Sequence, residues 1–280
     1  HNKHKNTFYC EESYVIPWMY PYMEPHGLIL KINKNPLSSL TPDMVTNDHD
    51  FWEWSTHRLL NNPKFLRDVV ARKTFSKLRG AIGGLYAYRR MYDEAAYAFG
   101  QARDLYDLSP EANFRLAEIN VRQGKYDEAI ALTEAFLEKD PGNVQVRAYL
   151  NKIKTNREKE KRRRQLEPLL SKGGSIDQAL ELLQLYRDLG QAGAFDSLGS
   201  QLVNNPALQP AHFSRGARLA GTMRRFAVAR MFAQRHTERF PSDPNGWIDL
   251  AAVQISIGKH EEVVASLTKA VELGGNQARR

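Results

Sequence analysis

The sequence predicts an all-α protein of stacked antiparallel helix pairs in two blocks, with a small N-terminal β-hairpin or irregular segment. The tetrapeptide Tyr-Asp-Glu-Ala begins at Tyr92 and again at Tyr126, 34 residues later. The same spacing relates Phe213 to Trp247 in the C-terminal part. A fixed period of this length is typical of two-helix units that bury their apolar faces only by stacking on one another.

The first 40 residues do not follow this period. Six aromatic residues and three prolines crowd into residues 8–25. The prolines are expected to exclude a helix here. We therefore expect two short strands, over residues 8–16 and 28–32, on either side of a Pro-Trp-Met-Tyr-Pro-Tyr turn that begins at Pro17. Such a pair is marginal alone, so residues 1–40 should pack on the helices as an extended segment.

A helix is predicted to start at Thr41-Pro42-Asp43, since a capping hydroxyl, a first-turn proline and an early acidic residue favour a helix N-terminus. This helix should reach about Leu60, and a new one should begin at Pro63. Apolar residues then keep a helical period as far as Tyr88, which predicts that the first repeat's leading helix continues without a break. Residues 41–155 thus form helices plus two repeats.

Within those two repeats, large and small residues and a helix-ending proline recur at regular places. The second unit has Leu116, Ala117, Gly124, Tyr126, Ala129, Ile130 and Pro141, and the first has Ile82, Gly83, Tyr86, Ala95, Phe99 and Ala102. This pattern resembles the tetratricopeptide repeat (TPR) family. The sequence departs from the family pattern at Asp107, which replaces the proline, so that the turn moves to Ser109-Pro110, and at Asn120, Thr133 and Phe136. The alternative is an ordinary pair of helical hairpins that share the Tyr-Asp-Glu-Ala tetrapeptide by chance.

The net charge of +8 is concentrated in one stretch. Residues 152–164 hold eight Lys or Arg against two Glu, an excess of +6. One long helix is predicted over residues 144–172, and its polar part, residues 156–174, is either a solvent-exposed basic bridge or a disordered linker. Because no aromatic residue interleaves with the basic run, nucleic acid is an unlikely partner.

The C-terminal region recovers the 34-residue period. Residues 210–243 and 244–277 form two further TPR-like repeats, and residues 175–208 form a degenerate one. Gly274 and Gly275 are predicted to end the last helix, as glycine commonly does. Residues 175–280 thus form the second block.

Composition narrows the class of protein further. A hydrophobic content of 42% is ordinary for a soluble protein. No stretch approaches the ~18–20 apolar residues of a membrane span, so this chain is expected to be soluble as given. A single cysteine, Cys10, excludes an internal disulfide framework.

The helix that starts at Pro42 carries one candidate set of metal-ligand residues. His49, Glu53 and His57 lie on one face of it. The two histidines are about 12 Å apart along the axis, which is too far for one ion, so we expect a solvated or partly packed polar face. No metal and no cofactor is predicted.

A second resemblance concerns the N-terminal half. Three segments resemble the soluble C-terminal region of bacterial multi-spanning membrane proteins related to protein O-mannosyltransferases. These segments are Phe8–Tyr22, Pro25–Leu28 and Ala71–Arg79. The resemblance covers residues 8–140 and implies that any catalysis lies in a membrane portion absent from this chain. The sequence begins at His1 without an initiator methionine, as though a larger polypeptide had been cut. The resemblance then implies several upstream hydrophobic segments of about 20 residues. The repeats would then be tethered to a membrane and could contact their own membrane domain.

Function is expected from the repeats, since the sequence has no phosphate loop, metal-ligand spacing or nucleophile elbow, and no catalytic residue is predicted. Projecting the family's groove onto the first helices gives Lys77, Tyr88, Phe114, Glu118, Val121, Arg122, Ser214, Arg218, Thr222, Ile248 and Ile255. The Lys-Asn-Asn-Lys-Arg set by which chaperone-binding members hold a terminal carboxylate is absent. The favoured function is a protein–protein interaction scaffold that binds a protein or peptide, as the tail of a membrane glycosyltransferase-like protein. The alternatives are a free-standing TPR adaptor and a nucleic-acid binder through residues 152–164.

Overall fold

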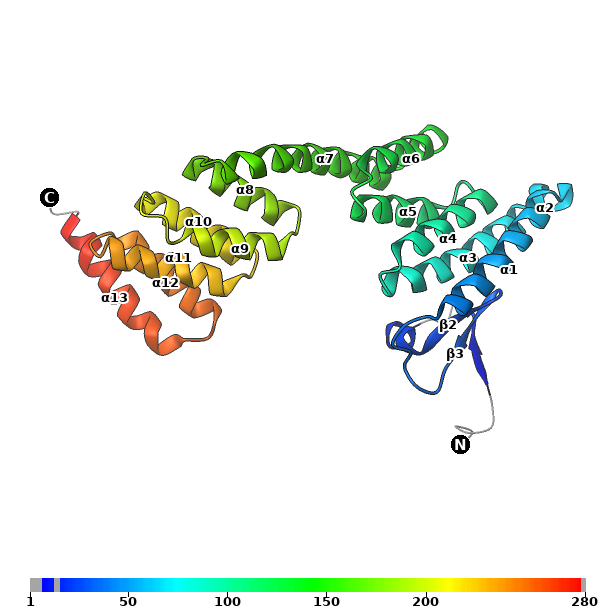
Figure 1. Cartoon of the computed structure of the whole chain (residues 1–280), viewed down its shortest axis with the longest axis horizontal. Helices are drawn as coiled ribbons and strands as arrows, with labels where there is room; N and C mark the ends of the chain where they lie inside the picture. Colours follow the sequence, from blue (N-terminus) through cyan, green and yellow to red (C-terminus); the bar gives the residue numbers. More distant parts are fainter. Residues whose placement is uncertain (1–6, 13–15, 278–280) are drawn as a thin grey trace. The chain divides into compact units, whose positions relative to one another are not determined.

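A computed structural model describes residues 7–12 and 16–277 of the chain (Figure 1). The chain divides into two compact units, His1–Lys154 and Thr155–Arg280. Apart from a small N-terminal sheet, the regular structure of the described residues is helical in both units, which confirms the predicted fold class. No helix in the described ranges is long and apolar enough to cross a membrane.

The N-terminal sheet of unit 1 has three strands: β1 (Phe8–Cys10), β2 (Met23–His26) and β3 (Ile29–Ile32). They are antiparallel in the order β1-β3-β2. The sequence prediction missed β2 because it contains Pro25, which lacks a ladder donor. Pro25 is tolerated because β2 lies at the sheet edge. Residues 13–15 of the predicted first strand lie outside the described residues.

The predicted turn at Pro17 is in fact a 3-10 helix, η2 (Pro17–Tyr22). The expectation that prolines exclude a helix here is therefore wrong. Proline fixes φ near the helical value, and Pro17 at the first position has no N–H that the helix needs. A helix this short loses few backbone hydrogen bonds to Pro21.

α1 (Pro42–Leu60) starts and ends as predicted, and the Thr41 hydroxyl accepts a hydrogen bond from the Met44 N–H. α2 (Pro63–Arg67) follows, and α3 (Val69–Tyr88) begins after Asp68. The predicted unbroken helix is therefore wrong. The Asp68 carboxylate accepts a hydrogen bond from the Ala71 N–H at 3.0 Å and caps a new helix, an alternative that Asp offers the backbone.

The repeats of unit 1 pack α3 against α4 (Tyr92–Leu105) and α5 (Pro110–Arg122) against α6 (Tyr126–Lys139), followed by α7 (Val144–Ser171). The turn between α4 and α5 is at Ser109-Pro110, as predicted, with Ser109 as the cap. Small residues allow the helices to approach closely. A Cβ on Gly83 would lie 3.0 Å from the Phe99 ring, and the equivalent alanines Ala95 and Ala129 are completely buried.

Replacing Ala129 by leucine is expected to destabilise the fold by about 1–3 kcal/mol, because added methyl groups overpack a closed contact. Ala131, two residues away on α6, is exposed and provides the matched control. Urea unfolding followed by circular dichroism measures both variants. Equal midpoints for Ala129→Leu and Ala131→Leu would contradict the predicted repeat register.

Arg89, just after α3, connects the N-terminal segment to the first repeat. Its guanidinium donates hydrogen bonds to the backbone carbonyls of Leu37, Tyr20, Pro21 and Met23 at 3.0–3.2 Å. A planar group with five donors suits several carbonyls of an irregular segment at once. The N-terminal segment therefore packs on the helices through specific contacts as well as through apolar burial.

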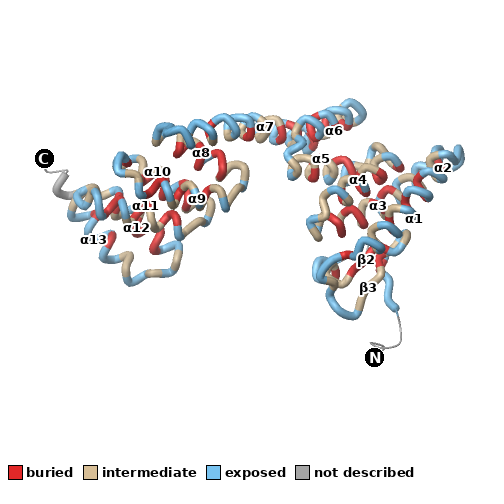
Figure 2. Tube along the Cα trace, in the orientation of Figure 1, coloured by how far each residue is buried: buried red, intermediate tan, exposed pale blue. Residues whose placement is uncertain are grey.

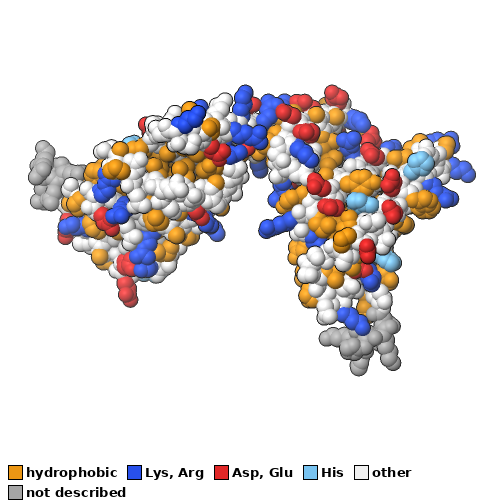
Figure 3. Space-filling model, in the orientation of Figure 1, with side chains coloured by type: hydrophobic (Ala, Val, Ile, Leu, Met, Phe, Trp, Pro, Cys, Tyr) orange, Lys and Arg blue, Asp and Glu red, His pale blue; other side chains and the backbone are white. Residues whose placement is uncertain are grey.

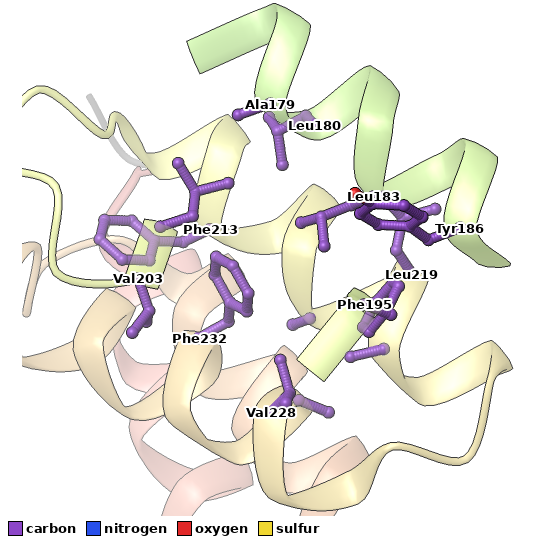
Figure 4. Packing of buried hydrophobic residues seen from close by; sticks show 14 of the residues in the cluster. Ala179, Leu180, Leu183, Tyr186, Phe195, Val203, Phe213, Leu219, Val228 and Phe232 are labelled. Carbon is purple, nitrogen blue, oxygen red and sulfur yellow. The ribbon is translucent and has the colours of Figure 1, made fainter. Parts of the chain in front are cut away.

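Unit 2 contains three helix pairs: α8 (Ile176–Asp188) with α9 (Ala192–Leu202), α10 (Pro210–Thr222) with α11 (Phe226–Arg239), and α12 (Pro244–Ser256) with α13 (His260–Gln277). Buried residues line the inner sides of these pairs, and the rings of Phe195, Phe213 and Phe232 lie at the centre (Figures 2 and 4). α13 runs past Gly274 to Gln277, so the predicted end of the helix at the glycines is wrong.

The basic run on α7 packs against carboxylates instead of being solvated all round. The Arg162 guanidinium binds Glu181 of α8 at 2.7 and 2.9 Å, and Lys159 pairs with Asp188 at 2.8 Å. On α7 itself, the buried Glu160 accepts hydrogen bonds from both Arg163 and Arg164. Cationic and acidic side chains accordingly lie next to one another over α7 in Figure 3. Much of the run's charge is neutralised locally.

Candidate functional site: the first-helix surfaces

We call the exposed side of the first helix in each repeat pair the first-helix surface. In unit 1 the first helices are α3 and α5, and the surface is centred on α5. Phe114, Glu118 and Arg122 follow one another at helical spacing, and the Arg122 guanidinium binds the Glu118 carboxylate at 2.8 Å. The Phe114 ring lies 5.2 Å from the ring of Tyr149 on α7. Burial raises the pKa of Tyr149, and the Glu118 charge adds to the rise, so these side chains form one group.

Ion pairing holds Glu118 in its charged form. Partial burial would raise its pKa, but hydrogen bonds and charges from Arg122 and Arg115 keep the pKa below its ordinary value. Arg115 lies 3.3 Å from the same carboxylate. A fixed carboxylate between two guanidinium groups offers a ligand both acceptor and donor atoms.

The other predicted residues of unit 1 lie elsewhere on the surface. The Tyr88 ring stacks on Tyr20 with centroids 4.9 Å apart, and 52% of Tyr88 is exposed. Lys77 pairs with Glu12 at 3.1 Å. Val121 is half-buried against the core below α5, so little of it is accessible to a ligand.

Sequence reasoning missed three members of this surface: Tyr20, Arg115 and Tyr149. Tyr20 joins this surface through its stacking on Tyr88, and burial raises the pKa of Tyr20 while the charges of Arg115 and Glu111 on α5 also act on it. Tyr20 belongs to the N-terminal segment and Tyr149 to α7, where no family groove position was projected. A 34-residue period therefore gave no signal for either.

In unit 2, the predicted residues divide between surface and core. Ile248 and Ile255 on α12 are 50% and 53% exposed, and Arg218 and Thr222 on α10 are also exposed. Ser214 is buried, so its projection onto a ligand-binding surface is wrong. Arg215, which the projection missed, reaches from α10 to Gln184 of α8 at 3.3 Å.

Ser214 belongs instead to a buried polar group between the last two repeats. Its Oγ lies 3.5 Å from Nδ1 of His236, and Nε2 of His236 lies 3.0 Å from the Asp243 carboxylate. A Cβ on Gly246 would lie 3.0 Å from the His236 ring, so glycine lets α12 approach. Burial raises the pKa of the neighbouring Asp249. Although Ser, His and Asp also form hydrolytic triads, His236 is completely buried, so this group links helices.

His49 and His57 on α1 have contacts other than a metal ion. His57 lies within hydrogen-bond distance of the Asn61 side chain at 3.1 Å, and the His49 ring packs 4.7 Å from Tyr97. In the described part of the chain, no group of three or more His, Cys, Asp or Glu side chains is placed to hold a metal ion.

Comparison with known families identifies the central helix pairs. Residues 81–144 match the family model described as "Tetratricopeptide repeat". The helix pairs in this stretch are therefore similar to TPR repeats. The match begins within α3, includes α4, α5 and α6 completely, and covers under half of the chain. No curated protein sequence matches the chain.

Solved TPR-like structures show a distant likeness. "MamA AMB-1" is 17% identical with a TM-score of 0.30, over 71% of this chain and 98% of that chain. A second MamA structure is 12% identical with a TM-score of 0.32, over 73% and 94%. YrrB, described as a TPR protein with an unusual peptide-binding site, is 13% identical with a TM-score of 0.30, over 78% and 92%. Such scores are too low to match helices one to one.

Proposed function

We propose that this chain is a non-catalytic protein-interaction scaffold, which binds protein or peptide segments on the first-helix surfaces of its repeats. The observation that carries the proposal is the group Phe114, Glu118, Arg122 and Tyr149 on α5 and α7. Aromatic and arginine side chains dominate the binding energy of protein interfaces. Here they are held in place before a ligand arrives, which lowers the entropic cost of binding.

Unit 2 supports the same function with a different surface. The exposed Ile248 and Ile255 stand seven residues apart on one side of α12, and Arg218 is exposed on the neighbouring α10. Exposed aliphatic side chains near an arginine provide an apolar contact with a polar rim. The two surfaces differ in composition, so each unit should select its own segment.

Selection from a short random peptide library on the full chain tests this function. The selected peptides should lose about ten-fold in affinity, or 1.4 kcal/mol, when a surface residue that contacts them is replaced. The variants are Tyr88→Ser and Arg122→Glu for unit 1 and Ile248→Ser and Ile255→Ser for unit 2. Fluorescence anisotropy with labelled peptides measures the affinities.

Second helices provide the controls. Glu138→Lys on α6 and Val264→Ser on α13 change exposed residues of the same kinds, and both should leave the affinities unchanged. The opposite result would contradict the proposal: the selected peptides would bind the two control variants weakly and all four first-helix variants with unchanged affinity. The binding surface would then lie on the second helices.

The more specific expectation, a tail of a membrane glycosyltransferase-like protein, stays a prediction that depends on the N-terminal resemblance. The nucleic-acid alternative is weakened by the ion pairs on α7. Affinity for phosphates comes from cations that release counterions. Lys159, Arg162 and Arg163 are instead engaged by carboxylates.

A further inference from the structure

A cavity of about 760 Å³ lies between the β2–β3 hairpin and α1 in unit 1. Leu28 and Ile29 line it from the hairpin, and Met44, Asn47 and Phe51 line it from α1. Its volume lies within the range of sites that hold small ligands and anchoring side chains. Its walls are mainly apolar, and no projected groove residue lines it.

Aromatic rings extend the cavity onto the surface. The Tyr9 ring lies 5.0 Å from His26, and the Phe51 ring lies 6.5 Å from Trp54, with Phe51 also against Gly27. Trp54 is 59% exposed. We call Tyr9, His26, Leu28, Phe51 and Trp54 the hairpin–α1 surface. Contiguous exposed aromatic residues beside a cavity mark an interaction site rather than ordinary surface scatter.

Exposed carboxylates border this surface, and one cation, the Arg58 guanidinium, lies 5.3 Å from the Trp54 ring. Met44, Asn47, Phe51 and Trp54 are spaced by three, four and three residues and so share one side of α1. Asp43 and Asp50 each precede a member of this row and are exposed. Within the described ranges, no cation lies at ion-pair distance from either. An acidic border in a chain of net charge +8 indicates a basic partner.

We propose that the hairpin–α1 surface binds a basic peptide segment of a partner protein, in which one or two apolar side chains are flanked by Lys or Arg. The apolar side chains enter the cavity between Leu28 and Phe51. The flanking cations lie beside Asp43 and Asp50. An apolar side chain of the peptide packs beside the Trp54 ring, which already carries the Arg58 guanidinium of this chain. The acidic border would repel an anionic lipid surface, which argues against membrane docking.

Two defined peptides test the proposal on the full chain. One is Gly-Lys-Lys-Leu-Phe-Lys-Lys-Gly, and the other has Glu in place of every Lys. The basic peptide should bind about ten-fold more tightly at low salt, and the difference should shrink in 0.5 M NaCl, where the Debye length falls to roughly 4 Å. A third peptide, with Ser-Ser in place of Leu-Phe, should bind with about ten-fold lower affinity than the basic peptide.

Variants locate the binding. Trp54→Ser and Asp50→Lys should each lower the affinity of the chain for the basic peptide by about ten-fold. Trp18→Ser is the matched control, because Trp18 is 65% exposed in the same unit but outside this surface. Glu272→Lys, an exposed acid of unit 2, is the charge control. Both controls and the first-helix variant Arg122→Glu should bind normally.

Several outcomes would overturn the proposal. Equal binding of the basic and acidic peptides would remove the charge preference, and equal losses in Trp18→Ser and Trp54→Ser would remove the location. Binding to neutral vesicles that Trp54→Ser abolishes would assign the surface to lipid. Thermal melts of all variants show whether each one folds, since these exposed positions should change the melting temperature little.

Discussion

Replacing Asp48 by alanine is expected to lower the free energy of unfolding of unit 1 by about 3–5 kcal/mol, because removing one partner leaves the other charge buried and uncompensated. Asp48 on α1 and Arg79 on α3 form a completely buried ion pair at 2.8 Å. Arg79 also donates to Gln101 of α4, and its guanidinium lies 5.2 Å from the Trp52 ring.

Tyr86 completes this buried group by donating its hydroxyl proton to the Asp48 carboxylate at 2.9 Å. Burial and the Asp48 charge raise the pKa of Tyr86, which keeps it a donor. The group joins α1, α3 and α4, so its loss should loosen the first repeat together with α1.

Tryptophan fluorescence during urea unfolding measures the effect. A Trp247→Phe background restricts the signal to Trp18, Trp52 and Trp54 of unit 1. Asp50→Ala, two residues away and exposed, is the control and should change stability by less than about 0.5 kcal/mol. The double variant Asp48→Leu with Arg79→Met should recover most of the stability, since an apolar pair can replace a buried ion pair. A single variant as stable as wild type would refute the role of this group.

Phe232→Ala is expected to destabilise unit 2 by about 3–5 kcal/mol, because the cavity left by a buried aromatic ring adds to the lost transfer energy. Phe232 on α11 is completely buried and lies 6.4 Å from the Phe213 ring of α10. A Cβ on Gly216 would lie 2.6 Å from the Phe232 ring, so the ring fills the space that this glycine leaves.

The matched control for unit 2 is Phe226→Ala, at the first residue of the same helix. Phe226 is half-buried, so its replacement should lower the free energy of unfolding clearly less than Phe232→Ala does. The fluorescence of Trp247, in a background without the unit 1 tryptophans, reports unfolding. If both substitutions lower the free energy of unfolding equally, the packing of α11 on α10 is not as described.

The helix pairs could be predicted because a 34-residue period records which side of each helix is buried, and that information is local. The break at Asp68 was not predictable from apolar spacing, because the apolar period continues through α2 and α3 while the Asp68 carboxylate caps a new helix. Strand β2 was missed for a related reason. Whether Pro25 is allowed depends on the position of the strand in the sheet, which the sequence does not show.

The candidate site was predictable only in part. Arg122, Ile248 and Ile255 are exposed, because family positions follow helix geometry, and their role in binding stays a prediction. Ser214 sits on the same projected row, but it is buried, and its Oγ lies 3.5 Å from Nδ1 of His236 on the following helix. Tyr20 and the hairpin–α1 surface depend on how the N-terminal segment packs on the helices. No repeat period contains that information.

Hydrogen–deuterium exchange of the full chain, with and without a peptide selected as described above, tests the central claim most directly. Binding on the first-helix surfaces should slow exchange in α5 and the first turns of α7, or in α10 and α12, because a bound segment suppresses local opening. Exchange in the second helices α4, α6 and α11 should change little. Protection confined to those second helices would contradict the assignment of function to the first-helix surfaces.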